Sequence, residues 1–70
     1  MGATTYSDIG PVEIERLTPK AVKIKRGTEE HWMPLSVLDA DTRSQIEPTT
    51  KKLSVFEVAD WFIEKERIEV

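Results

Sequence analysis

His31 has the widest chemical repertoire of any residue in this chain, because it is the one histidine among 70 residues that include no cysteine. A metal site built on it would need carboxylates, and the nearest are its sequence neighbours Glu29 and Glu30. Adjacent residues in a turn rarely converge on one ion, since metal sites take spaced ligands that surround the metal. The sequence therefore predicts no metal centre and no cofactor.

Nucleophilic chemistry has equally little to build on. The hydroxyl candidates are the serines, and His31 is the only imidazole that could activate one of them. No serine lies in a Gly-x-Ser-x-Gly elbow, and the three glycines are too scattered to form a phosphate-binding loop. The paired carboxylates Glu29 and Glu30 fall in a predicted turn, where solvated side chains are favoured over an acid with a raised pKa. We therefore expect no enzymatic activity. The serines considered are Ser7, Ser36, Ser44 and Ser54.

A basic stretch beside an aromatic side chain is the first of two binding features. Lys23, Lys25 and Arg26 fall on or near one face of the stretch 20–26, and Trp32 follows shortly after. Small barrels that hold single-stranded nucleic acid combine such a basic track with stacking aromatics. The formal net charge of -3 argues against a protein devoted to phosphate binding. A small-barrel nucleic-acid-binding module is therefore the alternative function.

The second feature is acidity combined with an aromatic anchor. Carboxylates are spread over the predicted loops and the last helix, and they would suit docking on a basic groove of a larger partner. The sequence thus favours a non-enzymatic protein that acts by protein–protein contact. The acidic residues are Glu29, Glu30, Asp39, Asp41, Glu47, Asp60, Glu64 and Glu66. The predicted binding residues are Trp32, Lys23, Lys25, Arg26, Glu29 and Glu30.

Alternating side chains predict the strands that position these residues. Residues 11–17 and 21–26 each alternate apolar and charged positions, with turn chemistry between them, so they are expected to pair as a hairpin. In that hairpin Glu13 and Glu15 would share a face with Lys23 and Lys25. Residues 27–30 predict a second turn and residues 31–35 a third strand, in which Pro34 indicates an edge or a strand end. These three segments predict an antiparallel meander.

The rest of the chain predicts a polar loop and a terminal helix. Residues 39–50 are rich in turn formers, while residues 52–58 can form either a last strand or, from a capping box at Ser54 and Glu57, the start of the helix. Helical spacing places Trp61 and Phe62 against the sheet. We expect an α+β fold: a small curved antiparallel sheet of three to five strands, which could close into an SH3-like barrel, and one short C-terminal helix. Residues 1–10 are expected to be a flexible segment and residues 11–68 a single domain.

The chain also shows no signal for a membrane. No apolar run approaches the roughly 20 residues that span a bilayer, and the start of the chain lacks the pattern of a signal peptide. We therefore expect a cytoplasmic protein with no membrane contact.

The segments 20–24, 30–36 and 60–66 together resemble a group of short proteins encoded by phages and prophages. The shared features are an alternating strand, the Trp-x-Pro-x-Ser turn formed here by Trp32, Pro34 and Ser36, a polar loop and a short helix containing a tryptophan. The resemblance implies a bacterial host cell, a host or phage protein as partner, and an accessory role as an inhibitor or counter-defence protein. Where such proteins have a glycine near the end of the helix, this chain has Arg67. That departure leaves the end of the helix unspecified.

Overall fold

The computed structural model describes residues 4–69, which form two antiparallel sheets and two short helices. The four-stranded sheet has the order β4-β3-β2-β5, and the two-stranded sheet pairs β1 with β6. The strands are β1 (Tyr6–Asp8), β2 (Val12–Leu17), β3 (Ala21–Arg26), β4 (Glu29–Pro34), β5 (Lys52–Leu53) and β6 (Glu57–Ala59). The helical elements are η1 (Leu35–Val37), α1 (Ala40–Gln45) and α2 (Asp60–Glu66). The predicted α+β class, with a small curved sheet and a C-terminal helix, is confirmed, whereas the sheets do not close into a barrel.

The β2-β3-β4 meander follows the predicted alternation. Val22 and Ile24 of β3 are buried, and Met33 of β4 lies directly opposite Val22. Gly27 adopts a φ of 63°, a left-handed conformation that glycine reaches without steric cost, and the tight turn brings Glu29 into register with Arg26. Because the turn is this short, β4 begins two residues before the predicted third strand.

A bulge in β2 changes the expected charge pairing of the first hairpin. Glu13 lies opposite Lys25 as expected, but the register shifts between Ile14 and Arg16, so that Arg16 and not Glu15 lies opposite Lys23. The extra residue at a bulge reverses which side chains share a face beyond it. Glu15 therefore has no directly opposite partner on β3, whereas Glu13 shares a face with Lys25 as predicted.

The domain extends further toward the N-terminus than the predicted start at residue 11. Strand β1 pairs with β6 in the register Ser7 to Val58, and Ile9 after it is fully buried. Within the segment expected to be flexible, residues 6–9 are thus built into the fold, and residues 1–3 lie outside the described part of the chain. Gly10 completes this attachment, because a Cβ there would overlap the backbone carbonyl of Ser54.

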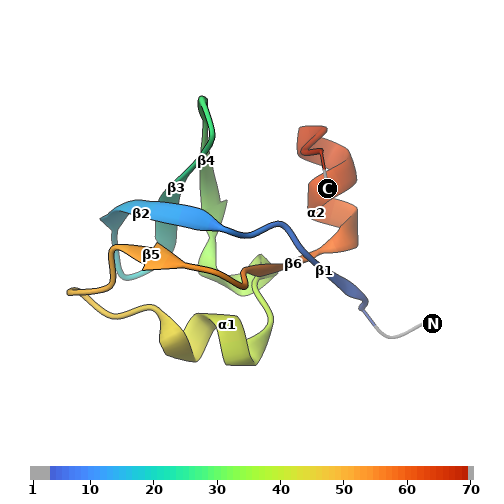
Figure 1. The fold of residues 1–70 in the computed structure, drawn as a ribbon. Coiled ribbons are helices and arrows are strands. Elements are labelled where there is room, and N and C mark those ends of the chain that lie inside the picture. Colours follow the sequence, from blue (N-terminus) through green and yellow to red (C-terminus); the bar gives the residue numbers. More distant parts are fainter. Residues whose placement is uncertain (1–3, 70) are drawn as a thin grey trace.

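The C-terminal half settles the two alternatives for residues 52–58. These residues form β5, a bend and β6, and α2 begins only at Asp60. The polar stretch 39–50 is not wholly a loop, because Asp39 caps α1 by accepting a hydrogen bond from the backbone N–H of Asp41 at 3.1 Å. In Figure 1, α1 and α2 lie on opposite sides of β6.

Arg67 ends α2 in the conformation usually reserved for glycine. Its φ of 56° is left-handed. Its backbone N–H bonds the carbonyl of Glu64 at 3.2 Å, and the N–H of Ile68 bonds the carbonyl of Ile63 at 3.0 Å. This is the Schellman arrangement, completed by burial of Ile63 and Ile68 in the core. The helix therefore ends at a defined position despite the missing glycine.

The buried core connects both sheets with α2. Phe56 and Val58 are fully buried beside residues of the four-stranded sheet, and Phe62 attaches the helix. The core consists of Ile9, Val12, Val22, Ile24, Met33, Val37, Leu38, Phe56, Val58, Ala59, Phe62, Ile63 and Ile68.

Candidate protein-interaction surface

Trp32 lies on the outer face of the four-stranded sheet, opposite to the core. The strand alternation that buries Val22 and Ile24 places Lys23 and Lys25 on this outer face, and the register puts Lys23 directly opposite Trp32. Trp32 is 49% exposed, so a large aromatic surface remains in contact with water. We call the set Lys23, Lys25, Glu30 and Trp32 the Trp32 surface.

An ion pair orders the charges beside the tryptophan. The Nζ of Lys23 lies 3.1 Å from Oε1 of Glu30, and both side chains are partly exposed. The hydrogen bond from Lys23, together with its charge, lowers the pKa of Glu30 below the ordinary value. Glu30 therefore stays ionised at neutral pH. The pair adds little to stability because it is exposed, but it holds Lys23 along β4.

One row of charges crosses the whole sheet. Lys52 of β5 lies opposite Glu13 of β2, Glu13 opposite Lys25 of β3, and Lys25 opposite Glu30 of β4. The sign thus alternates from one strand to the next. Such cross-strand pairs favour this register, and the row is neutral as a whole because its two lysines balance its two glutamates.

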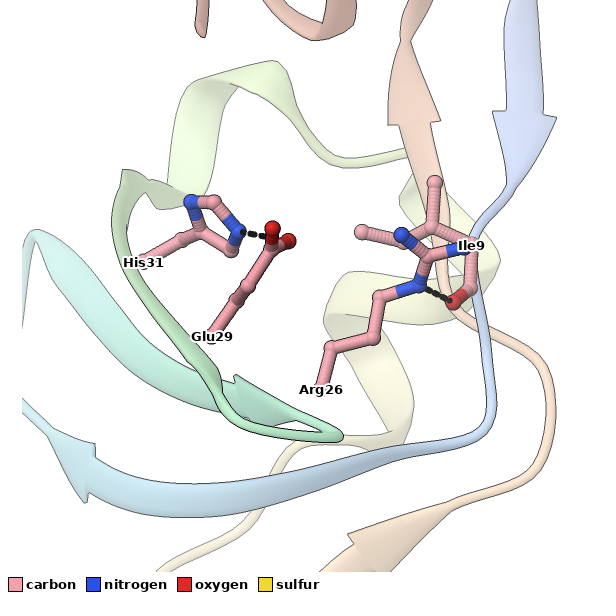
Figure 2. A network of polar contacts seen from close by, with 4 residues as sticks. All are labelled: Ile9, Arg26, Glu29 and His31. Atoms are coloured by element: carbon pink, nitrogen blue, oxygen red, sulfur yellow. Dashed lines mark hydrogen bonds and ion pairs between the residues drawn. The ribbon is translucent and has the colours of Figure 1, made fainter. Parts of the chain in front are cut away.

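Arg26 and Glu29 lie on the other face of the sheet and are not part of the Trp32 surface. Figure 2 shows the Arg26 guanidinium reaching the segment after β1, where its Nε donates a hydrogen bond of 2.8 Å to the carbonyl oxygen of Ile9. Glu29 and His31 extend from β4 toward each other, with Oε1 and Nε2 at 3.4 Å. Arg26 thus joins the hairpin to the N-terminal segment, and the prediction that it shares a basic track with Lys23 and Lys25 is wrong. Its strand parity, the same as that of Val22 and Ile24, was the available signal.

The structure adds two cations that the sequence analysis did not select. Arg16 joins the row of Lys23 and Trp32 because of the bulge, and Lys52 joins the charge row because β5 pairs with β2. Nothing in the local pattern marks Lys52, since its partner Glu13 is distant in sequence. For Arg16, only knowledge of the bulge would have placed it opposite Lys23.

Exposed apolar side chains also occur away from the Trp32 surface. Trp61 is 54% exposed and Tyr6 is 37% exposed, whereas Phe62 is buried. The Trp61 ring meets the Phe62 ring edge to face, with centroids 5.8 Å apart. The prediction that both aromatics press onto the sheet is therefore confirmed for Phe62 and wrong for Trp61. With α2 only two turns long, one aromatic suffices to cover the adjoining core.

Asp60 and Asp8 anchor the two-stranded sheet. Asp60 accepts hydrogen bonds from the hydroxyls of Ser7 at 2.6 Å and Thr5 at 2.5 Å, and these bonds lower its pKa. Asp8 accepts from the backbone N–H groups of Phe56 at 2.9 Å and Gly10 at 2.8 Å, and these bonds lower its pKa as well. Both carboxylates hold chain segments together.

Within residues 4–69 the structure shows no pocket and no group of three or more side chains that could hold a metal ion. No helix in this range is long and apolar enough to cross a membrane. Comparisons with protein-family models, with curated proteins and with solved structures found no match.

Proposed function

We propose that this domain is a non-enzymatic binding protein that contacts a partner protein through the Trp32 surface. The observation that carries the proposal is the half-exposed Trp32 on an edge strand, with an ordered ion pair beside it. Tryptophan is enriched among the residues that dominate binding energy at interfaces, and charges around such an anchor mainly govern the association rate and the choice of partner. An accessory or inhibitory role of phage type would follow if the contact covers the partner's own working surface.

Nucleic-acid binding is the second candidate, and one observation favours it. Arg16, Lys23 and Trp32 lie side by side across three strands. A cationic row ending in an aromatic ring is a suitable platform for a single strand. The neighbouring row carries Glu13 and Glu30, which repel phosphates, and we therefore rank this function second.

The chain offers a matched control for testing the first function. Trp32→Ala and Trp61→Ala remove the same side chain from positions of similar exposure on different elements. We expect partner proteins captured from bacterial lysate by the wild type to be lost with Trp32→Ala and retained with Trp61→Ala. Equal capture by both variants would contradict the assignment of the Trp32 surface.

A salt series with a short single-stranded oligonucleotide separates the two functions. We expect only weak binding in the range of about 10⁻⁴ to 10⁻⁶ M at physiological salt, as for non-specific contacts. A tighter interaction that weakens steeply with salt and is lost in the Lys23→Gln, Lys25→Gln variant would reverse the ranking.

A further inference from the structure

The backbone N–H and C=O groups of β4 point alternately toward β3 and toward the open edge of the sheet. The backbone N–H of Leu35 donates to the carbonyl of Lys20 at 2.9 Å, one step beyond the pair of Ala21 with Pro34. Hydrogen-bonded and non-hydrogen-bonded pairs alternate along an antiparallel ladder, so every second β4 residue after Leu35 bonds β3. The residues between them, Trp32 and Glu30, direct their N–H and C=O groups away from β3.

No other described segment uses these groups. β4 is the outermost strand of its sheet, and no backbone hydrogen bond between residues 4–69 from outside the ladder reaches Glu30 or Trp32. The backbone nitrogen of Pro34 points toward the open edge, as those of Trp32 and Glu30 do. The N–H that proline lacks is therefore not needed for the hydrogen bonds between β3 and β4. At this edge Glu30 and Trp32 each offer a free backbone N–H and a free C=O, and Pro34 ends the series because it has no N–H.

The alternating charges across the sheet indicate which side chain a further strand should place beside Glu30. From β5 to β4 the row reads Lys52, Glu13, Lys25 and Glu30, with each residue directly opposite the next. A further strand that continues the alternation places a cation beside Glu30. Two residues along, the same strand lies beside the exposed ring of Trp32, which favours an apolar side chain there.

A second copy of this chain suits the edge poorly. Pairing β4 with β4 of another copy about a two-fold axis would bring two Glu29 and two Glu30 side chains into one short ladder. Like charges directly opposite each other are destabilising, and β4 carries no lysine or arginine that could lie beside Glu30.

We infer that the β4 edge accepts an extended segment of a partner protein as a fifth strand, with a lysine or arginine beside Glu30 and an apolar side chain beside Trp32. The inference rests on the proposed function and names the way in which the Trp32 surface would bind. Main-chain hydrogen bonds supply affinity in such strand addition, and alternate side chains supply specificity.

The first experiment uses synthetic peptides of about six residues, the length of β4, in which one lysine and one valine lie two positions apart, so that the lysine can lie beside Glu30 and the valine beside Trp32. NMR titration is expected to shift the backbone amides of Glu30 and Trp32 most. The same peptide with glutamate in place of lysine should bind at least about tenfold more weakly. Two lysine peptides methylated on alternate backbone nitrogens, one at odd positions and one at even positions, keep their charge. Only the peptide whose methyl groups replace the N–H groups that face β4 should lose binding. Equal binding by the lysine and glutamate peptides, or full binding by both methylated forms, would overturn the inference.

The second experiment changes the edge itself. Glu30→Ala and Glu30→Pro remove the same carboxylate, but only Glu30→Pro also removes the outward N–H while leaving the β3–β4 ladder intact. We expect Glu30→Pro to bind the lysine peptide at least about fivefold more weakly than Glu30→Ala, with circular dichroism confirming that both fold. If partner capture depends on Trp32 while the two Glu30 variants bind equally, strand addition fails and the proposed function stands. If Trp32→Ala leaves capture unchanged, the proposed function fails as well. If the β4 amide signals of the protein alone shift with protein concentration, the edge pairs with a second copy of the chain and the inference fails.

Discussion

The two adjacent aromatics of α2 should differ sharply in their contribution to stability. Phe62 is 5% exposed and belongs to the core, so Phe62→Ala is expected to lower the free energy of unfolding by about 3 to 5 kcal/mol. A domain of this length has a total stability of roughly 3.5 to 10 kcal/mol, so this variant should lose between about a third of its stability and all of it.

Trp61→Ala should cost no more than about 2 kcal/mol. Trp61 is 54% exposed, and its edge-to-face contact with Phe62 is worth about 0.5 to 1.5 kcal/mol. Alanine also has the higher helix propensity, which offsets part of the loss.

Urea denaturation followed by far-UV circular dichroism measures both variants against the wild type. With a slope of about 1 kcal/mol per molar for a small domain, the two midpoints should differ by more than about 1 M. A Trp61→Ala variant destabilised as much as Phe62→Ala would refute the packing of α2 described above.

Three further outcomes follow from the structure. Arg67→Gly should raise the free energy of unfolding by about 0.5 to 1 kcal/mol in the same assay, because glycine adopts a φ of 56° without steric cost; a destabilised variant would contradict the assigned end of α2. Asp8 and Asp60 have folded pKa values below the ordinary 3.8, so their stabilising contribution is complete only well above 3.8 and is lost as the pH falls through the folded pKa values. The urea midpoint should therefore decline below about pH 5, and a flat profile down to pH 3 would exclude this role. Arg26→Ala should cost about 1 to 2 kcal/mol through its lost hydrogen bond, and Lys25→Ala less than about 1 kcal/mol; equal costs would contradict the placement of Arg26.

The sequence predicts the meander because local alternation is enough to define it. Val22 and Ile24 indicate the buried face of β3, and Gly27 indicates the tight turn between β3 and β4. The register of the β2–β3 hairpin was harder to predict from the sequence, since the bulge before Arg16 reverses the faces of β2 without any change in the residue pattern. The pairing of β1 with β6 joins the two ends of the chain, and no local signal could reveal it.

The candidate surface was predictable in part for the same reason. Lys23, Lys25, Glu30 and Trp32 are brought together by the regular β3–β4 ladder. Arg26 lies outside this surface because strand parity, and not proximity in sequence, decides which face of the sheet a side chain takes.

Hydroxyl-radical footprinting of the two tryptophans in a complex with the captured partner shows whether the Trp32 surface forms the contact. Oxidation reports solvent contact of each side chain, and both rings are about half exposed in the free domain. We expect strong protection of Trp32, with Trp61 oxidised as fast as in the free domain. Protection of Trp61 with unchanged oxidation of Trp32 would contradict this expectation.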